Sequence, residues 1–150
     1  MDAVTYPDTD VISFINEYMI PLRVQHDREP TATDFNIKRT PTVVTLDPEG
    51  NEHHRTVGFL GPEDLIASLL LGIAKVYFDK DQFGDALLSL NKILSEHANS
   101  DSAPEAIFIK GVSEFKGFNN PNKLRDAYER LKSQYPDNEW TKRAYPYSLI

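Results

Sequence analysis

The sequence contains no cysteine among its 150 residues. Without a thiol, the chain has no disulfide, no thiolate nucleophile and no thiolate ligand for a metal. Thiol redox chemistry by the chain itself is therefore excluded. A phosphate-binding glycine loop, a nucleophile elbow and a metal signature are missing as well. The sequence thus indicates no catalytic residue, no metal site and no cofactor.

Long apolar runs and blocks of positive charge are also missing. No stretch approaches the ~20 apolar residues that cross a membrane. The N-terminal residues Met-Asp-Ala-Val-Thr-Tyr-Pro lack the basic and apolar regions of an export signal, so a cytoplasmic location is the default expectation. Sixteen Lys and Arg against 23 Asp and Glu give a net charge of −7. Because a nucleic-acid binder must neutralise phosphates, we expect neither nucleic acid nor a membrane as partner.

The part of the chain before residue 61 mixes helix and strand signals. A capping residue, Asp8 or Thr9, precedes apolar residues that recur with a period near 3.6, which predicts a helix over 9–18. Thr42-Val43-Val44-Thr45-Leu46 is rich in β-branched residues and predicts a buried strand. The other elements expected here are a strand over 21–25, a short helix within 30–36, a turn over 47–51 and a second hairpin strand over 52–58.

The second part of the chain favours helices throughout, at about 62–79, 82–96, 103–116, 121–134 and 138–143. Gly72 alone seldom ends a helix, since it costs only about 1 kcal/mol relative to Ala. We therefore expect residues 62–79 to form one helix shared by both parts. Trp140 and the segment Tyr145-Pro146-Tyr147 are expected to fold back on the last helix pair, although such a tail also suits a partner anchor.

The segment Phe35–Gly50, with Thr40-Pro41 before the strand, and the ending Gly58-Phe59-Leu60-Gly61-Pro62-Glu63 resemble the thioredoxin fold. The stretch Val4–Val11 resembles the branch that includes the C-terminal thioredoxin domain of bacterial transmembrane disulfide reductases. The resemblance implies that Pro41 is cis and that Thr40 and Pro41 offer backbone groups to an extended peptide. The alternative is that Pro41 only shapes the turn into the strand.

The chain departs from the thioredoxin pattern because the CxxC segment and the central strand are missing. Either Met1 is an internal methionine of a longer protein, or the chain is a natural cysteine-free derivative. In the first case the CxxC lies just upstream of Met1. Without the central strand, we expect the strands near 21–25 and 42–46 to pair directly or the chain to form a homodimer through the incomplete sheet.

The helical part resembles tetratricopeptide repeats. The order of small and large residues is similar at Leu70, Ile73, Ala74, Tyr77, Phe83, Ala86, Leu90 and Ile93, and a poorer second unit spans Ala103–Asp137, with Gly111 and Ala127 at the small positions. The resemblance implies that Lys75, Phe78 and Asp79 face a concave groove and bind a partner. The alternative is that Phe78 simply packs on the neighbouring helix.

His53-His54 is a pair that suggests a metal site. Adjacent residues of a strand point to opposite faces, so they cannot chelate one ion. We interpret both as exposed strand histidines.

These observations predict an α/β then all-α fold, that is, an incomplete thioredoxin-like sheet with a C-terminal tetratricopeptide-like helical extension. The thioredoxin-like part would span residues 1–71, and the helical part 62–150, sharing the helix 62–79. The expected function is a non-catalytic protein-interaction module with a protein or peptide partner. The alternative is part of a thiol–disulfide oxidoreductase whose CxxC lies upstream of Met1.

Overall fold

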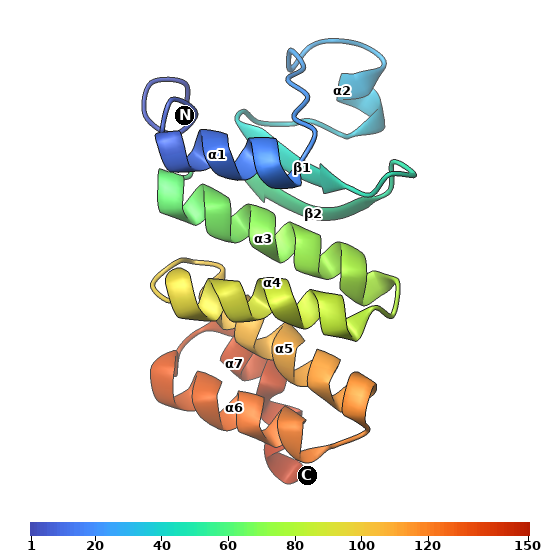
Figure 1. Ribbon diagram of the computed structural model, residues 1–150, viewed down its shortest axis with the longest axis vertical. Coiled ribbons are helices and arrows are strands. Elements are labelled where there is room, and N and C mark those ends of the chain that lie inside the picture. The colour runs from blue at the N-terminus through green and yellow to red at the C-terminus, as the bar shows by residue number, and fades with distance from the viewer.

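The computed structural model describes residues 1–150. It shows a two-stranded antiparallel sheet followed by a run of helices, stacked in chain order from the N-terminal to the C-terminal end (Figure 1). None of the helices is long and apolar enough to cross a membrane. The elements are α1 (Thr9–Tyr18), α2 (Thr31–Asp34), β1 (Thr42–Leu46), β2 (Glu52–Val57), α3 (Pro62–Asp79), α4 (Phe83–Glu96), α5 (Ala103–Phe118), α6 (Asn122–Gln134), α7 (Glu139–Ala144) and a 3₁₀ helix, η1 (Tyr145–Leu149).

Helix α1 begins where the sequence places its cap. The Asp8 carboxylate accepts hydrogen bonds from the backbone N–H groups of Asp10 and Val11, at 3.0 and 3.2 Å. This satisfies two donors that have no partner inside the helix. Val11 and Phe14 then turn one face of the helix into the core, so α1 packs on α3.

Helix α3 is the central element, and it is unbroken from Pro62 to Asp79 as expected. Its 18 residues correspond to about 27 Å at 1.5 Å per residue. Every residue from Leu65 to Gly72 is buried, because α1, both strands and α4 pack around this helix. Gly72 lies in the middle of this run, where a Cβ atom would stand 2.8 Å from Cβ of Thr45. The glycine therefore permits the close approach of α3 and β1.

The two strands form a hairpin with one irregularity. Thr45 lies opposite His54, but the next residue, Leu46, lies opposite Glu52. His53 is therefore an extra residue in β2, that is, a β-bulge, which locally breaks the alternation of side chains. The hairpin turn is closed by Asp47, whose carboxylate accepts from the backbone N–H of Asn51 at 2.8 Å.

The expected strand over 21–25 is wrong. Residues 21–25 form no strand, and β1 pairs only with β2, so direct pairing of these two segments does not occur. The neighbouring Ile20 and Leu22 are 97% and 86% exposed. A strand is stable only where a neighbour satisfies its backbone groups, and no other strand makes backbone hydrogen bonds to residues 21–25. The Thr40–Pro41 bond is cis as expected, and Glu29–Pro30 is also cis.

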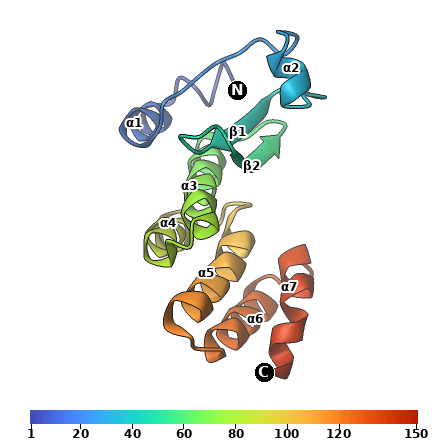
Figure 2. The same cartoon turned by 90° about the vertical axis from the view of Figure 1, so that its right-hand side faces the viewer.

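Small residues at a helix crossing and the aromatic C-terminal tail determine how the C-terminal helices pack. A Cβ atom on Gly111 would stand 2.5 Å from Cβ of Ala127, so α5 and α6 cross closely at the two predicted small positions. The tail folds back as expected, since the Tyr147 ring stacks on Phe108 with centroids 5.7 Å apart. Figure 2 shows α7 and the C-terminal turn lying alongside α5 and α6.

Candidate functional site

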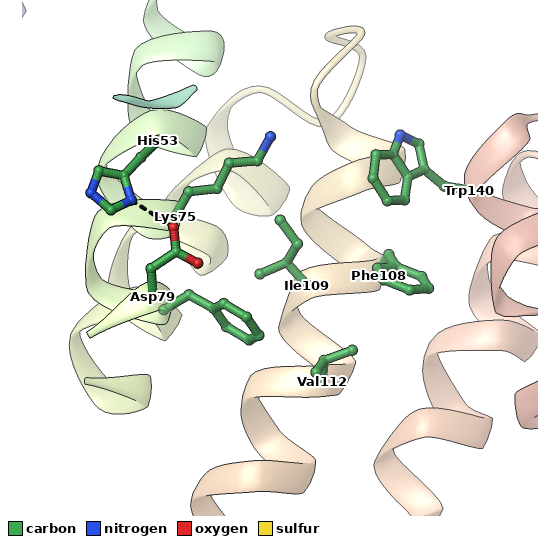
Figure 3. Close-up of a pocket in the computed structure, with 8 residues that line it drawn as sticks. His53, Lys75, Asp79, Phe108, Ile109, Val112 and Trp140 are labelled. Carbon is green, nitrogen blue, oxygen red and sulfur yellow. Dashed lines mark hydrogen bonds and ion pairs between the residues drawn. The ribbon is translucent and has the colours of Figure 1, made fainter. Parts of the chain in front are cut away.

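A groove lies between α3 and α5, with the hairpin at one rim and α7 at the other (Figure 3). We call it the α3–α5 groove, and its volume is about 270 Å³. The three residues predicted to face a concave surface all line it, together with residues from β2, α5 and α7. The lining consists of His53, Lys75, Phe78, Asp79, Phe108, Ile109, Val112 and Trp140.

The apolar side of the α3–α5 groove comes mainly from α5 and α7. Phe108 and Trp140 have ring centroids 5.2 Å apart and stand across the groove from His53 and Asp79 (Figure 3). Ile109 is 9% exposed, whereas the aromatic rings are half-buried. Trp140 is the only tryptophan in the chain. Half-buried aromatic rings of this kind are enriched at protein interfaces.

Lys75 connects the hairpin to the two helices at the polar side. Its Nζ lies 2.5 Å from a carboxylate oxygen of Glu105 on α5 and 3.0 Å from Nδ1 of His54 on β2. Since Nδ1 accepts from Lys75, Nε2–H of His54 donates to Ser68 Oγ at 3.0 Å. Burial, reinforced by the Lys75 charge, lowers the pKa of His54 to about 4. His54 is thus a neutral hydrogen-bonding link between the hairpin and α3.

His53 joins the hairpin to the C-terminal end of α3. Its Nδ1 lies 2.6 Å from Asp79 Oδ2, and its Nε2 lies 3.2 Å from Asp47 Oδ2. Both ring nitrogens can donate to carboxylates only when the imidazole is protonated. The Asp79 hydrogen bond is the main cause that raises the pKa of His53, with burial opposing and Asp47 assisting.

Asp47 is held ionised at the centre of this network. Its side chain is 3% exposed, and the Asn51 side-chain hydrogen bond is the largest effect on its pKa, which lies well below the usual range. Lys80 Nζ lies 3.6 Å from the same carboxylate and 2.8 Å from that of Glu49. The network therefore pairs each buried charge with an opposite one.

The interpretation of His53 and His54 as exposed residues is wrong. The His53 side chain is 9% exposed, and both histidines bond to side chains of α3. The physical reason is the bulge at His53, which turns two adjacent side chains toward the same helix. No feature of the sequence predicts the bulge, because it arises from the pairing of β1 with β2.

The histidine network does not form a metal site. No group of three or more His, Asp or Glu side chains is arranged to hold a metal ion. The two carboxylates approach His53 at opposite ring nitrogens. A single ion cannot be bound by both carboxylates and one nitrogen in that geometry.

The other predicted pair, Thr40 and Pro41, lies apart from the α3–α5 groove. Thr40 is exposed, and the Pro41 carbonyl already accepts from the N–H of Gly58 at 2.9 Å. Pro41 precedes β1, whereas Asp47, which bonds to His53 of the groove, follows it. The two predicted sites therefore lie at opposite ends of the hairpin. The structure therefore brings Lys75, Phe78 and Asp79 together with His53 and separates them from Thr40 and Pro41.

Phe108 is a groove residue that the sequence analysis did not identify. The spacing of Phe108, Ile109 and Val112 on α5 places them on one helical face. That spacing is the signal in the sequence from which Phe108 could have been predicted. Trp140 belongs to the tail that the sequence predicted to fold back and that also suits a partner anchor, and the folded-back tail brings it into the groove beside Phe108.

Comparisons with known proteins assign no family to the chain. No family model matches the chain, and no curated protein or solved structure matches it either.

Proposed function

We propose that this chain is a non-catalytic protein-interaction module whose partner inserts a large apolar side chain into the α3–α5 groove. The observation that carries the proposal is the convergence of Phe78, Phe108 and Trp140 around one hollow of about 270 Å³. That volume is slightly below the ~300–1,000 Å³ typical of small-molecule sites. It suits one or two side chains of a peptide better than a cofactor.

The polar rim supports binding rather than chemistry. Lys75 is paired with Glu105, and Asp79 with His53, so the charges around the groove are matched within the chain. A partner that buries these pairs leaves no charge without its counterpart, which avoids a large desolvation cost. An apolar anchor surrounded by satisfied polar groups is the usual anatomy of an interface.

The lone tryptophan provides a direct test. Peptides would be selected from a displayed random library on the immobilised protein, then titrated in solution while the fluorescence of Trp140 is recorded. We expect the selected peptides to share a large apolar residue and to change the Trp140 emission. Substitution Val112→Arg, which fills the groove, should weaken binding at least tenfold, about 1.4 kcal/mol or more.

The matched control is Leu88→Arg, because Leu88 on α4 is 70% exposed and does not line the groove. This variant should bind as the parent chain does, and circular dichroism would show that both variants fold. Peptides that bind Val112→Arg unchanged, or no enriched peptide at all, would contradict the proposal.

A second candidate is that the chain forms part of a thiol–disulfide oxidoreductase. The order α1, α2, β1, β2, α3 supports it, since the thioredoxin resemblance implies these elements in this order, together with a strand over 21–25 that the structure lacks. Reading the genomic DNA in frame upstream of the Met1 codon tests it. A CxxC encoded there would favour the oxidoreductase, and a stop codon would exclude it.

A further inference from the structure

The polar rim of the α3–α5 groove contains a side chain whose charge changes near neutral pH. His53 lies between two carboxylates, with Nδ1 2.6 Å from Asp79 Oδ2 and Nε2 3.2 Å from Asp47 Oδ2. An imidazole donates from both nitrogens only when it is protonated. The Asp79 hydrogen bond raises the pKa of His53, with Asp47 assisting and burial opposing. The ring therefore releases its proton only above about pH 6.5.

The other charged side chains around His53 are paired among themselves. The pairs are Lys80 with Asp47 and Glu49, Lys75 with Glu105, and Arg55 with Glu52. Lys116 of α5 lies over the ring of Phe78, 5.3 Å from its centroid. β1 has no charged side chain, and α5 and α7 line the groove with apolar side chains alone. His53 is therefore the only cation that pairs with Asp79.

Asp79 is the part of this pair that a ligand would cover. Its side chain is 51% exposed, whereas that of His53 is 9% exposed. Asp79 lines the groove next to Phe78, and Figure 3 shows its carboxylate joined to the His53 ring on the side of the groove opposite Phe108 and Trp140. A side chain that fills the groove would thus remove water from the Asp79 carboxylate.

The cost of covering Asp79 depends on the charge of His53. When the imidazole is protonated, the covered carboxylate keeps a hydrogen-bonded counter-ion. When the imidazole is neutral, the carboxylate loses its water without a cation to replace it, which is strongly unfavourable. An apolar ligand therefore prefers the chain that holds the proton. By linkage, a bound ligand makes His53 hold that proton to a higher pH.

We propose that the α3–α5 groove is a proton-coupled site, which binds the apolar side chain of its partner with His53 protonated and releases it as His53 loses the proton. This inference rests on the proposed function of the groove, since it concerns how binding there is regulated. Because one proton is involved, the dissociation constant increases by at most about tenfold per pH unit.

N-Phenyl-1-naphthylamine is a suitable probe, because it is apolar, is uncharged between pH 6 and 9, and fluoresces more strongly in an apolar environment. Its dissociation constant for the 150-residue chain is measured across this pH range. We expect a value about fivefold or more larger at pH 9 than at pH 6, as for two coupled sites. Nuclear magnetic resonance of the imidazole needs no variant, and the pKa of His53 should be higher with the probe bound than without it.

Three variants identify the groups that couple the proton to binding. His53→Gln cannot titrate, so its affinity should be the same at pH 6 and pH 9. Asp79→Asn removes the carboxylate that the probe covers, so at pH 9 it should bind the probe more tightly than the parent chain does. A purely structural role of Asp79 would instead weaken binding at every pH. The matched control His26→Gln replaces an exposed histidine outside the groove and should keep the pH profile of the parent chain.

Val112→Arg separates this inference from the proposed function. Binding that Val112→Arg abolishes, but that is equal at pH 6 and pH 9 in the parent chain, would overturn the proton coupling and leave the proposed function standing. Absence of binding at every pH, or equal binding by Val112→Arg, would overturn the groove as an apolar site and the coupling with it. The same pH dependence in His53→Gln as in the parent chain, or an unchanged pKa of His53 with the probe bound, would also overturn the coupling.

Discussion

His53 shows how one residue can join two parts of the chain. It lies between Asp47 of the hairpin turn and Asp79 of α3, within hydrogen-bond distance of both. Protonation of the ring makes both nitrogens donors, whereas loss of the proton leaves one nitrogen lone pair facing a carboxylate. His54, one residue later, is stabilised in its neutral form, because Lys75 donates a hydrogen bond to its Nδ1.

These two preferences predict a maximum of stability near pH 6.5. The raised pKa of His53 means that the folded chain holds a proton that the unfolded chain releases, so stability falls as the pH rises above 6.5 through that pKa. The lowered pKa of His54, about 4, means that stability rises between pH 4 and 6.5, by about 3 kcal/mol at most. Urea unfolding at a series of pH values between 4.5 and 9 measures both the rise in stability up to pH 6.5, the acidic limb, and its fall above pH 6.5, the alkaline limb.

Two variants separate the limbs of this profile. His53→Gln should flatten the alkaline limb and leave the acidic one, and His54→Gln, which can still accept from Lys75 and donate to Ser68, should do the reverse. A profile in which neither substitution changes a limb would refute the assignment of the two protonation states.

At the scale of elements, α3 connects the hairpin region to the helical stack. The strands pack on this helix, and so do α1, α4 and α5. Its burial on several sides requires small residues at the crossings, above all Gly72 against Thr45. Gly72 lowers the intrinsic stability of α3 as an isolated helix. In the folded chain it allows the close contact between α3 and Thr45 of β1.

Alanine substitutions at two helical glycines should have opposite effects. Gly72→Ala gains about 1 kcal/mol of helix propensity but forces a Cβ to within 2.8 Å of the buried Thr45, and overpacking of this kind costs about 1–3 kcal/mol. We expect a net loss and a melting temperature lower by a few degrees. Gly84→Ala in α4, where a Cβ meets nothing within 4 Å, should raise it. Thermal unfolding followed by circular dichroism compares them, and stabilisation of both would contradict the packing argument.

At the scale of the whole molecule, the helices form an elongated stack with the hairpin region at one end (Figure 1). Each helix from α3 to α6 packs on the next along the chain. The α3–α5 groove lies where the hairpin meets the helices, and His53 at the bulge of β2 forms part of its lining. The geometry of the groove therefore depends on the hairpin as well as on the helices.

The whole chain should show no disulfide reductase activity. Thiolates are the nucleophiles of disulfide exchange, and the chain has none. Turbidity of insulin in the presence of dithiothreitol should therefore increase no faster with pure protein than with the reagent alone. A catalytic rate that rises with protein concentration would contradict this expectation.

The sequence alone determined the features that local chemistry controls. The bounds of α1 follow from the cap at Asp8 and the 3.6-residue period, and those of β1 from its β-branched run. The uninterrupted α3 follows from the absence of a strong breaker at Gly72. The resemblance to tetratricopeptide repeats singled out Lys75, Phe78 and Asp79, and all three line the α3–α5 groove.

Only the tertiary structure decided what depends on pairing between distant segments. Residues 21–25 have a strand-like sequence but no neighbouring strand, so they remain unpaired. His53 and His54 point toward the same helix because the pairing of β1 with β2 creates a bulge. Trp140 meets Phe108 through the folding back of a tail more than thirty residues later in the chain. Local propensity carries no information about such contacts, because their free energy comes from groups that meet only after the chain has folded.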